Sequence, residues 1–186
     1  MTKQEAFSLA VAFLKDLIGL ETVNPPGNER IAADYVARRL AEYGIAADVA
    51  EPVPGRANVV SRRTPGEGPV VVLTGHLDVV PVSDDWQTPP FATAEKEGKI
   101  FGRGACDMKG GIAAMMAAAV WNTVQGNEAR PFQLAFVFDE EIYGEGTRAF
   151  LKDFQEDCFA VIGEPTENQI HVAHRGAIRF RIRVRG

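Results

Sequence analysis

Short, uninterrupted apolar runs constrain this chain most, because they are too hydrophobic for half-exposed strands. VVVLT spans residues 70–74, LAFVF spans 134–138 and FAVI spans 159–162. Each run predicts a central strand covered on both faces. Helical patterns separate them, since GGIAAMMAAAVWNTV (110–124) is alanine-rich and TRAFLKDF (147–154) follows the second run. Such alternation of strand and helix predicts an α/β layered domain.

The N-terminal region predicts two helices followed by two short strands. Apolar residues recur at helical spacing from residue 3 to Gly19, and again after NPPGNE as far as Gly44. Strands are expected over 45–53 and 56–62, on either side of Pro54-Gly55. The first helix shows no signal-peptide pattern, which indicates a cytoplasmic protein.

Bulk composition excludes some classes of partner. The 186 residues carry a net charge of -5, so no basic field favours nucleic acid or an anionic membrane surface. A small molecule or peptide is the expected partner. The two cysteines, Cys106 and Cys158, are expected to be reduced packing residues rather than ligands. His171 and His174 are expected at surface or inter-domain positions.

Metal-competent side chains follow the apolar runs. His76 and Asp78 follow the first, Glu140 and Glu141 the second, and Glu164 the third. Ligands bind outside the carboxyl ends of strands in open α/β sheets, so these groups are expected to converge. Asp78 can orient the His76 imidazole through one nitrogen while the other binds metal. Adjacent glutamates point apart on an extended segment, which suits one ligand and one general base.

Asp107 completes the set from another part of the chain. It precedes a glycine-rich helix start, where backbone N–H groups favour an anion, and a carboxylate there can bridge two cations. One histidine with several carboxylates is compatible with a pair of divalent ions. Zinc is the leading candidate, with cobalt and manganese as alternatives.

Five motifs in order give this pattern a family resemblance: GHLDVVPV, WQTPPF, GRGACDMKGG, DEE and GEPT. The chain resembles the dinuclear zinc family of acetylornithine deacetylases, succinyl-diaminopimelate desuccinylases, aminoacylases and glutamate carboxypeptidases. The resemblance implies a three-layer α/β/α catalytic domain with a mostly parallel mixed sheet. It implies that His76 and Glu164 bind one metal, Glu141 binds the other and Asp107 bridges them. Glu140 is then the general base and Asp78 the orienting partner of His76.

The same resemblance implies hydrolysis of an N-acyl amino acid by a homodimeric enzyme. Residues 1–175 correspond to the N-terminal part of the catalytic domain. The alternating strand pattern within 176–186 corresponds to the first strand of a lid or dimerisation domain that is otherwise absent, so the fold is expected to be incomplete at the C-terminus. We therefore expect the chain alone to bind metal weakly and not to turn over.

Other functions fit parts of the pattern. A dipeptidase or carboxypeptidase of the same family uses the same ligands. A non-catalytic truncated module would keep the fold and act by association. A two-metal phosphoesterase also uses Asp, Glu and His, although Arg103 is the only nearby phosphate-holding candidate. NPPGN (24–28) and the loop 86–91 are expected either to wall the cleft or to act as packing turns.

Overall fold

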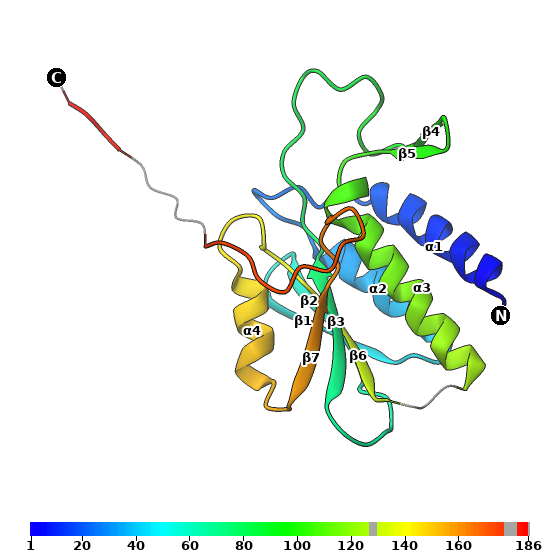
Figure 1. The fold of residues 1–186 in the computed structure, drawn as a ribbon. Helices are drawn as coiled ribbons and strands as arrows, with labels where there is room; N and C mark the ends of the chain where they lie inside the picture. The colour runs from blue at the N-terminus through cyan, green and yellow to red at the C-terminus, as the bar shows by residue number, and fades with distance from the viewer. Residues whose placement is uncertain (127–129, 177–181, 186) are drawn as a thin grey trace.

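A computed structural model describes residues 1–126, 130–176 and 182–185 (Figure 1). The helices are α1 (Lys3–Ile18), α2 (Arg30–Ala41), α3 (Gly110–Gln125) and α4 (Glu145–Asp153). The strands are β1 (Ala47–Val53), β2 (Arg56–Ser61), β3 (Val70–His76), β4 (Ala94–Lys96), β5 (Lys99–Phe101), β6 (Phe132–Val137) and β7 (Cys158–Ile162). The helices and the long strands lie where the sequence predicts them. The short β4–β5 hairpin was not predicted.

The main sheet is mixed and has the order β1-β2-β6-β3-β7. Strands β1, β2 and β6 pair antiparallel, whereas β6, β3 and β7 run parallel. From β3 the chain passes through α3 to β6 on one side, and then through α4 to β7 on the other side of β3. The carboxyl end of β3 is therefore a topological switch point, where open α/β sheets bind ligands.

Alternate residues of β3 face two different cores. Val71 and Leu73 pack against the larger core, which includes residues of α1, α2 and α3. Val70 and Val72 form a smaller core with Ala135, against which Phe150 and Phe154 of the α4 region pack. Helices thus cover both faces of the sheet, as Figure 1 shows. The predicted three-layer α/β/α fold is confirmed.

The prediction for FAVI was wrong in one respect. The run does form a strand, β7, but it is an edge of the described sheet and all of its residues are exposed. It pairs only with β3, so nothing in the described chain covers its outer side. The apolar content of a strand indicates how hydrophobic its side chains are, but it does not indicate how many neighbouring strands pair with it.

Three smaller predictions can be compared with the structure. Cys106 and Cys158 are free thiols as expected, yet both are exposed rather than packed inside, Cys106 on a turn and Cys158 on the edge strand. His171 and His174 are exposed, as predicted. The alternating strand after residue 176 falls mainly on 177–181, outside the described residues, and 182–185 form no strand.

Candidate active site

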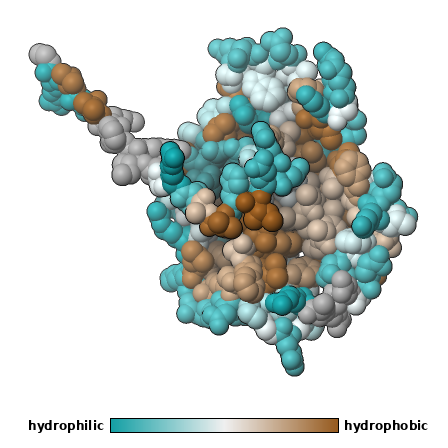
Figure 2. All heavy atoms as spheres, in the orientation of Figure 1, coloured by the Kyte–Doolittle hydropathy of each residue, from teal (hydrophilic) through white to brown (hydrophobic). Residues whose placement is uncertain are grey.

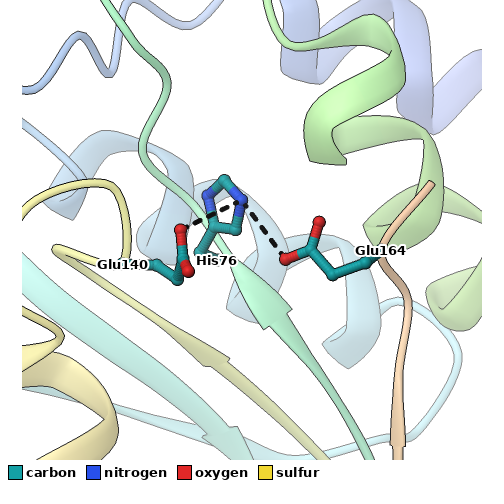
Figure 3. A group of neighbouring side chains, drawn as sticks. All are labelled: His76, Glu140 and Glu164. Carbon is teal, nitrogen blue, oxygen red and sulfur yellow. Dashed lines mark ion pairs between the residues drawn. The ribbon is translucent and has the colours of Figure 1, made fainter. Parts of the chain in front are cut away.

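The predicted site residues meet at the switch point. His76 ends β3, Glu140 and Glu141 follow β6, and Glu164 follows β7. The register sets His76 beside Val137 and Thr74 beside Ile162, so the three strands end at nearly the same level. Figure 3 shows His76, Glu140 and Glu164 pointing toward one another from these strand ends. The parallel pairing thus brings together side chains up to 88 residues apart, because it aligns carboxyl ends.

The imidazole of His76 is the centre of the cluster and is only 2% exposed. Its Nε2 lies 3.0 Å from Oδ1 of Asp107 and 3.6 Å from Oε1 of Glu164. Oε2 of Glu140 lies 3.8 Å from the same nitrogen. One ring nitrogen therefore faces a group of carboxylates.

The other nitrogen of His76 turns back toward Asp78. Nδ1 is 2.9 Å from the main-chain carbonyl oxygen of Asp78 and 3.5 Å from its carboxylate Oδ1. The Nδ1–H group therefore donates most directly to the carbonyl oxygen, while Nε2–H of the protonated ring donates to Asp107. The contact with Asp78 is thus made most directly by its main-chain oxygen, and the orienting role expected for its carboxylate stays a prediction.

The buried carboxylate of Asp78 has a further role in the loop after β6. It accepts hydrogen bonds from the main-chain N–H groups of Glu140 (3.1 Å) and Glu141 (3.2 Å). Burial alone raises the pKa of this carboxyl group, but its hydrogen bonds with His76 and Asn24 hold the pKa below its ordinary value. Asp78 is thus an ionised anchor for the glutamate pair.

Asp107 reaches the site from an irregular π-helical turn, Ala105–Lys109, that leads directly into α3. The hydrogen bond with His76 lowers the pKa of its carboxyl group against a smaller opposing effect of burial. The position just before the helix agrees with the sequence-based expectation. Its side chain is 57% exposed, so it lies at the open side of the cluster, between His76 and solvent.

The electrostatics of the cluster favour a cation. Burial lowers the pKa of the His76 imidazole, but hydrogen bonds to Asp107 and Asp78 outweigh it and raise the pKa from 6.5 to about 11. Burial raises the pKa of the Glu141 and Glu164 carboxyl groups, because their charged forms are partly removed from water. Positive charge placed among these side chains relieves both effects.

The donor set fits divalent metal ions. Ligand atoms lie within 4.8 Å of one another in the set His76, Glu140 and Glu164 and in the set His76, Asp107 and Glu141. Imidazole nitrogen and carboxylate oxygen are ligands of zinc, cobalt and manganese. Both glutamates of the pair approach His76, so the division into one ligand and one base stays a prediction.

Several polar residues behind the site, three of them buried and Arg56 partly buried, were not predicted as site residues. Asn24, Glu29, Arg56 and Asp139 form a hydrogen-bonded chain that ends at Asp78. The sequence marks Asn24 as part of the NPPGN turn and Asp139 as the first residue of the DEE motif, but assigns neither a place in the site. Their only sequence signal is position, because Asp139 directly precedes the glutamate pair and Asn24 precedes two prolines.

Comparison with known proteins agrees with this geometry. Residues 72–181, which include every residue of the cluster, match peptidase family M20/M25/M40. The chain belongs to this family. Its members are hydrolases of the metallopeptidase class, which implies the use of divalent metal. The resemblance inferred from the five motifs is therefore confirmed.

Curated relatives of this M20 chain are named as desuccinylases. A probable succinyl-diaminopimelate desuccinylase of Staphylococcus epidermidis is 32% identical over 182 residues, covering 95% of this chain and 44% of the relative. The succinyl-diaminopimelate desuccinylase of Rickettsia bellii is 33% identical over 192 residues, covering 94% of this chain and 48% of that protein. The chain thus spans less than half the length of these relatives.

Solved structures show the same fold. An M20 family metallo-carboxypeptidase from Sulfolobus solfataricus superposes with a TM-score of 0.73 at 19% identity, over 88% of this chain and 37% of that one. Human carnosine dipeptidase 1 gives a TM-score of 0.70 at 20% identity, over 86% of this chain and 39% of its own. At these identities the likeness concerns the fold alone. In the part of the chain that the structure describes, no helix is long and apolar enough to cross a membrane.

Proposed function

We propose that the 186-residue chain forms the N-terminal part of a metal-dependent amidohydrolase that cleaves the amide bond of an N-acyl amino acid. The observation that carries the proposal is the convergence of His76, Asp107, Glu141 and Glu164 with Glu140 at one switch point. The desuccinylase relatives support an N-succinyl or N-acetyl amino acid as substrate. Dipeptides are the alternative substrates within the same family.

His76, Glu164, Glu141 and Asp107 are the residues that would hold two divalent ions, with zinc the leading candidate and Asp107 the proposed shared ligand. When bound, such ions polarise the substrate carbonyl and lower the pKa of a water molecule. The geometry supports this assignment because His76 Nε2 faces Asp107 and Glu164. Cobalt and manganese suit the same ligands.

Glu140 has the position and exposure of a general base. Its side chain is 51% exposed beside His76, so it can meet both water and substrate. The carboxylate accepts a proton from the attacking water and delivers it to the leaving amine nitrogen as the C–N bond breaks. Asp78 fixes the main chain of Glu140, which keeps the carboxylate aimed at the site. The products are a free carboxylate and an amine.

For the full-length protein we propose a cytoplasmic homodimer in which residues 1–175 belong to the catalytic domain and the segment from residue 176 begins a lid or dimerisation domain. The substrate is a small molecule, and neither nucleic acid nor a membrane takes part. The phosphoesterase alternative is less well supported, because the guanidinium of Arg103 lies over the Trp86 ring at 5.0 Å and donates to the Pro81 carbonyl oxygen.

Substitution of the proposed base tests this function directly. In the full-length protein, Glu140→Gln should keep bound metal while kcat for N-succinyl-diaminopimelate or N-acetylornithine falls at least about 100-fold. Glu145→Gln is the matched control, since Glu145 is an exposed acid at the start of α4. A panel with zinc, cobalt or manganese should also include dipeptides and nitrophenyl phosphate. Near-normal turnover by Glu140→Gln would remove the assigned base, and turnover of the phosphate ester alone would reject the amidohydrolase.

A further inference from the structure

A single buried amide joins two carboxylates behind the site. Asn24 is 2% exposed, and its Nδ2 lies 2.8 Å from Oδ2 of Asp78 and 3.0 Å from Oδ1 of Asp139. Both carboxylates are almost completely buried, at 0% and 1% exposure. The Asn24 side chain belongs to neither the ligand set nor the proposed base, so the function described above leaves it without a role.

The chemistry of the contact requires an amide NH₂ group. Ionised carboxylates only accept hydrogen bonds, whereas an NH₂ group carries two donors and no charge. One Asn24 nitrogen can therefore hold both acids at once. The amide oxygen, Oδ1, is buried and has no partner within the described residues, so the side chain is oriented by its donors alone.

Main-chain contacts fix Asn24 beside Asp78. The Asn24 N–H donates to the Val79 carbonyl oxygen at 2.9 Å, and the Val79 N–H donates to the Thr22 carbonyl oxygen at 3.0 Å. The Thr22 hydroxyl donates to the Leu77 carbonyl oxygen at 2.6 Å. The segment before the two prolines is thus tied to the segment that carries His76 and Asp78.

The two carboxylates that Asn24 joins hold the glutamate loop from both ends. Asp78 accepts the N–H groups of Glu140 and Glu141, while Oδ2 of Asp139 accepts the N–H of Glu145 at 3.3 Å. Asp139 has a φ of 67°, in the left-handed region that a residue other than glycine occupies at a cost. A conformation of this kind persists only where its surroundings hold it.

An arginine supports only one of the two acids, whereas Asp78 faces the His76 imidazole, whose Nδ1 is 3.5 Å from its Oδ1. Nη2 of Arg56 lies 3.1 Å from Oδ1 of Asp139, and the same guanidinium makes two hydrogen bonds to the buried Glu29, at 2.8 and 2.6 Å. The described contacts place no arginine or lysine on Asp78. The Asn24 amide is therefore the link through which the Arg56–Asp139 pair is coupled to Asp78.

We propose that Asn24 is a positioning residue for the reaction. By joining Asp78 to Asp139 it fixes the main chain at Glu140 and Glu141, and so sets where the proposed base and ligand stand relative to His76. The catalytic consequence rests on the proposed function, whereas the effect on the loop concerns the folded chain itself. The two parts can be measured separately.

Amide exchange in the metal-free chain tests the effect on the loop. In Asn24→Ala and Asn24→Asp, NMR-detected hydrogen exchange of the Glu140 and Glu141 amides should accelerate at least about tenfold. The reason is that these variants lack the two Asn24 hydrogen bonds that local opening must break in wild type. Asn24→Asp keeps the shape of the side chain and removes its NH₂ donors. If that variant does not fold, Asn24→Ala carries the test. Wild-type exchange rates at both amides in a folded variant would overturn the proposal.

Kinetics of the full-length protein test the catalytic consequence. We expect kcat to fall about 10–100-fold in Asn24→Ala, the range for residues that orient metal ligands, with KM within about threefold. Ser61→Ala is the matched control, because Ser61 is 1% exposed and its Oγ accepts the Leu134 N–H at 2.9 Å, far from the glutamate loop. It should lower Tm and leave kcat and the two exchange rates unchanged.

The outcomes separate the two proposals. Faster exchange with unchanged kcat in an active enzyme overturns the catalytic role of Asn24. If wild-type protein hydrolyses none of the N-acyl amino acids or dipeptides, the proposed function is rejected. The exchange rates still test independently whether Asn24 holds the glutamate loop in place. A Ser61→Ala variant that loses kcat as strongly as Asn24→Ala reduces the effect of Asn24 to general destabilisation, which also overturns the proposal.

Discussion

At the scale of single residues, the proposed ligand role of His76 would make metal binding depend on pH. The His76 imidazole has a pKa of about 11 in the metal-free chain, against an ordinary value of 6.5. Between pH 6.5 and about 11 the folded protein therefore binds a proton at His76 that the unfolded chain does not. This proton stabilises the metal-free fold fully below pH 6.5, and the stabilisation is lost as the pH rises through 11. A metal ion that binds Nε2 must displace the proton.

Metal affinity should therefore rise with pH. We expect the apparent association constant for Co²⁺ to increase about tenfold per pH unit between pH 6.5 and 8.5, because one proton leaves for each ion bound. Titrations followed by Co²⁺ absorbance, with a chelator as competitor, measure this slope. His174→Ala should keep the slope, since His174 is exposed and belongs to neither group of possible metal ligands. A constant affinity across this range would contradict the assignment of His76 as a ligand.

Lys109 makes a second pH-dependent contribution, with the opposite sign. Burial lowers the pKa of its amine from 10.5 to about 7, and its Nζ donates to the Leu20 carbonyl oxygen at 2.7 Å. Between these two pKa values the unfolded chain binds more protons, so this residue makes stability rise with pH. Methionine does not titrate, so the free energy of unfolding of Lys109→Met lacks this rise. The free energy of unfolding of the variant minus that of wild type should therefore fall by about 1 kcal/mol per pH unit from pH 7 to 9. Urea unfolding at pH 7, 8 and 9 measures this difference. A difference that grows with pH would contradict the lowered pKa of the buried amine.

The sequence predicted the side chains that face the site but not those behind them. His76, Glu140 and Glu164 were found because each follows an apolar run, and that pattern is local. Asn24 and Asp78 are 54 positions apart, and their contact depends on pairing between Val23 and Val79. No local pattern encodes such a pairing, so this layer of the site became visible only in the structure.

At the scale of elements, periodicity and breakers placed the helices well. Thr2 and Glu5 form a capping box at the start of α1, and Gly126 ends α3 in the left-handed conformation. These are local effects, and the sequence carries them directly. The order of strands is not local, which explains why β7 was expected at the centre and lies at the edge.

The start of α3 approaches the end of β7 closely enough to require glycine. A Cβ at Gly111 would lie 2.2 Å from the main-chain oxygen of Gly163, the residue before Glu164. Gly111→Ala should therefore displace β7 from α3, destabilise the fold by about 1–3 kcal/mol and weaken Co²⁺ binding by moving Glu164. Ala118→Gly is the control on an exposed position of the same helix, and it should cost stability with no loss of Co²⁺ affinity. Equal Co²⁺ affinities in both variants would contradict this coupling.

At the scale of the whole molecule, a layered α/β domain was predictable because apolar strands alternate with helices along the chain, and the family resemblance implied its three layers. The uneven covering of the sheet was not predictable. Phe159 and Val161 remain 59% and 49% exposed on β7, and Figure 2 shows hydrophobic side chains gathered on the face where this strand lies. Within the described chain, one side of the sheet thus ends in an apolar strand with unpaired main-chain groups.

An exposed apolar edge strand is a site for self-association, because a second chain can extend the sheet and cover its side chains. We expect the 186-residue chain to self-associate at micromolar concentration. Val161→Lys should suppress this by placing a charge on the edge, as natural edge strands do. Phe7→Lys is the matched control, since Phe7 is 64% exposed on α1 and not on a strand. Sedimentation velocity measures the difference. If both variants stay associated to the same degree as wild type, the contact lies on a surface other than the β7 edge.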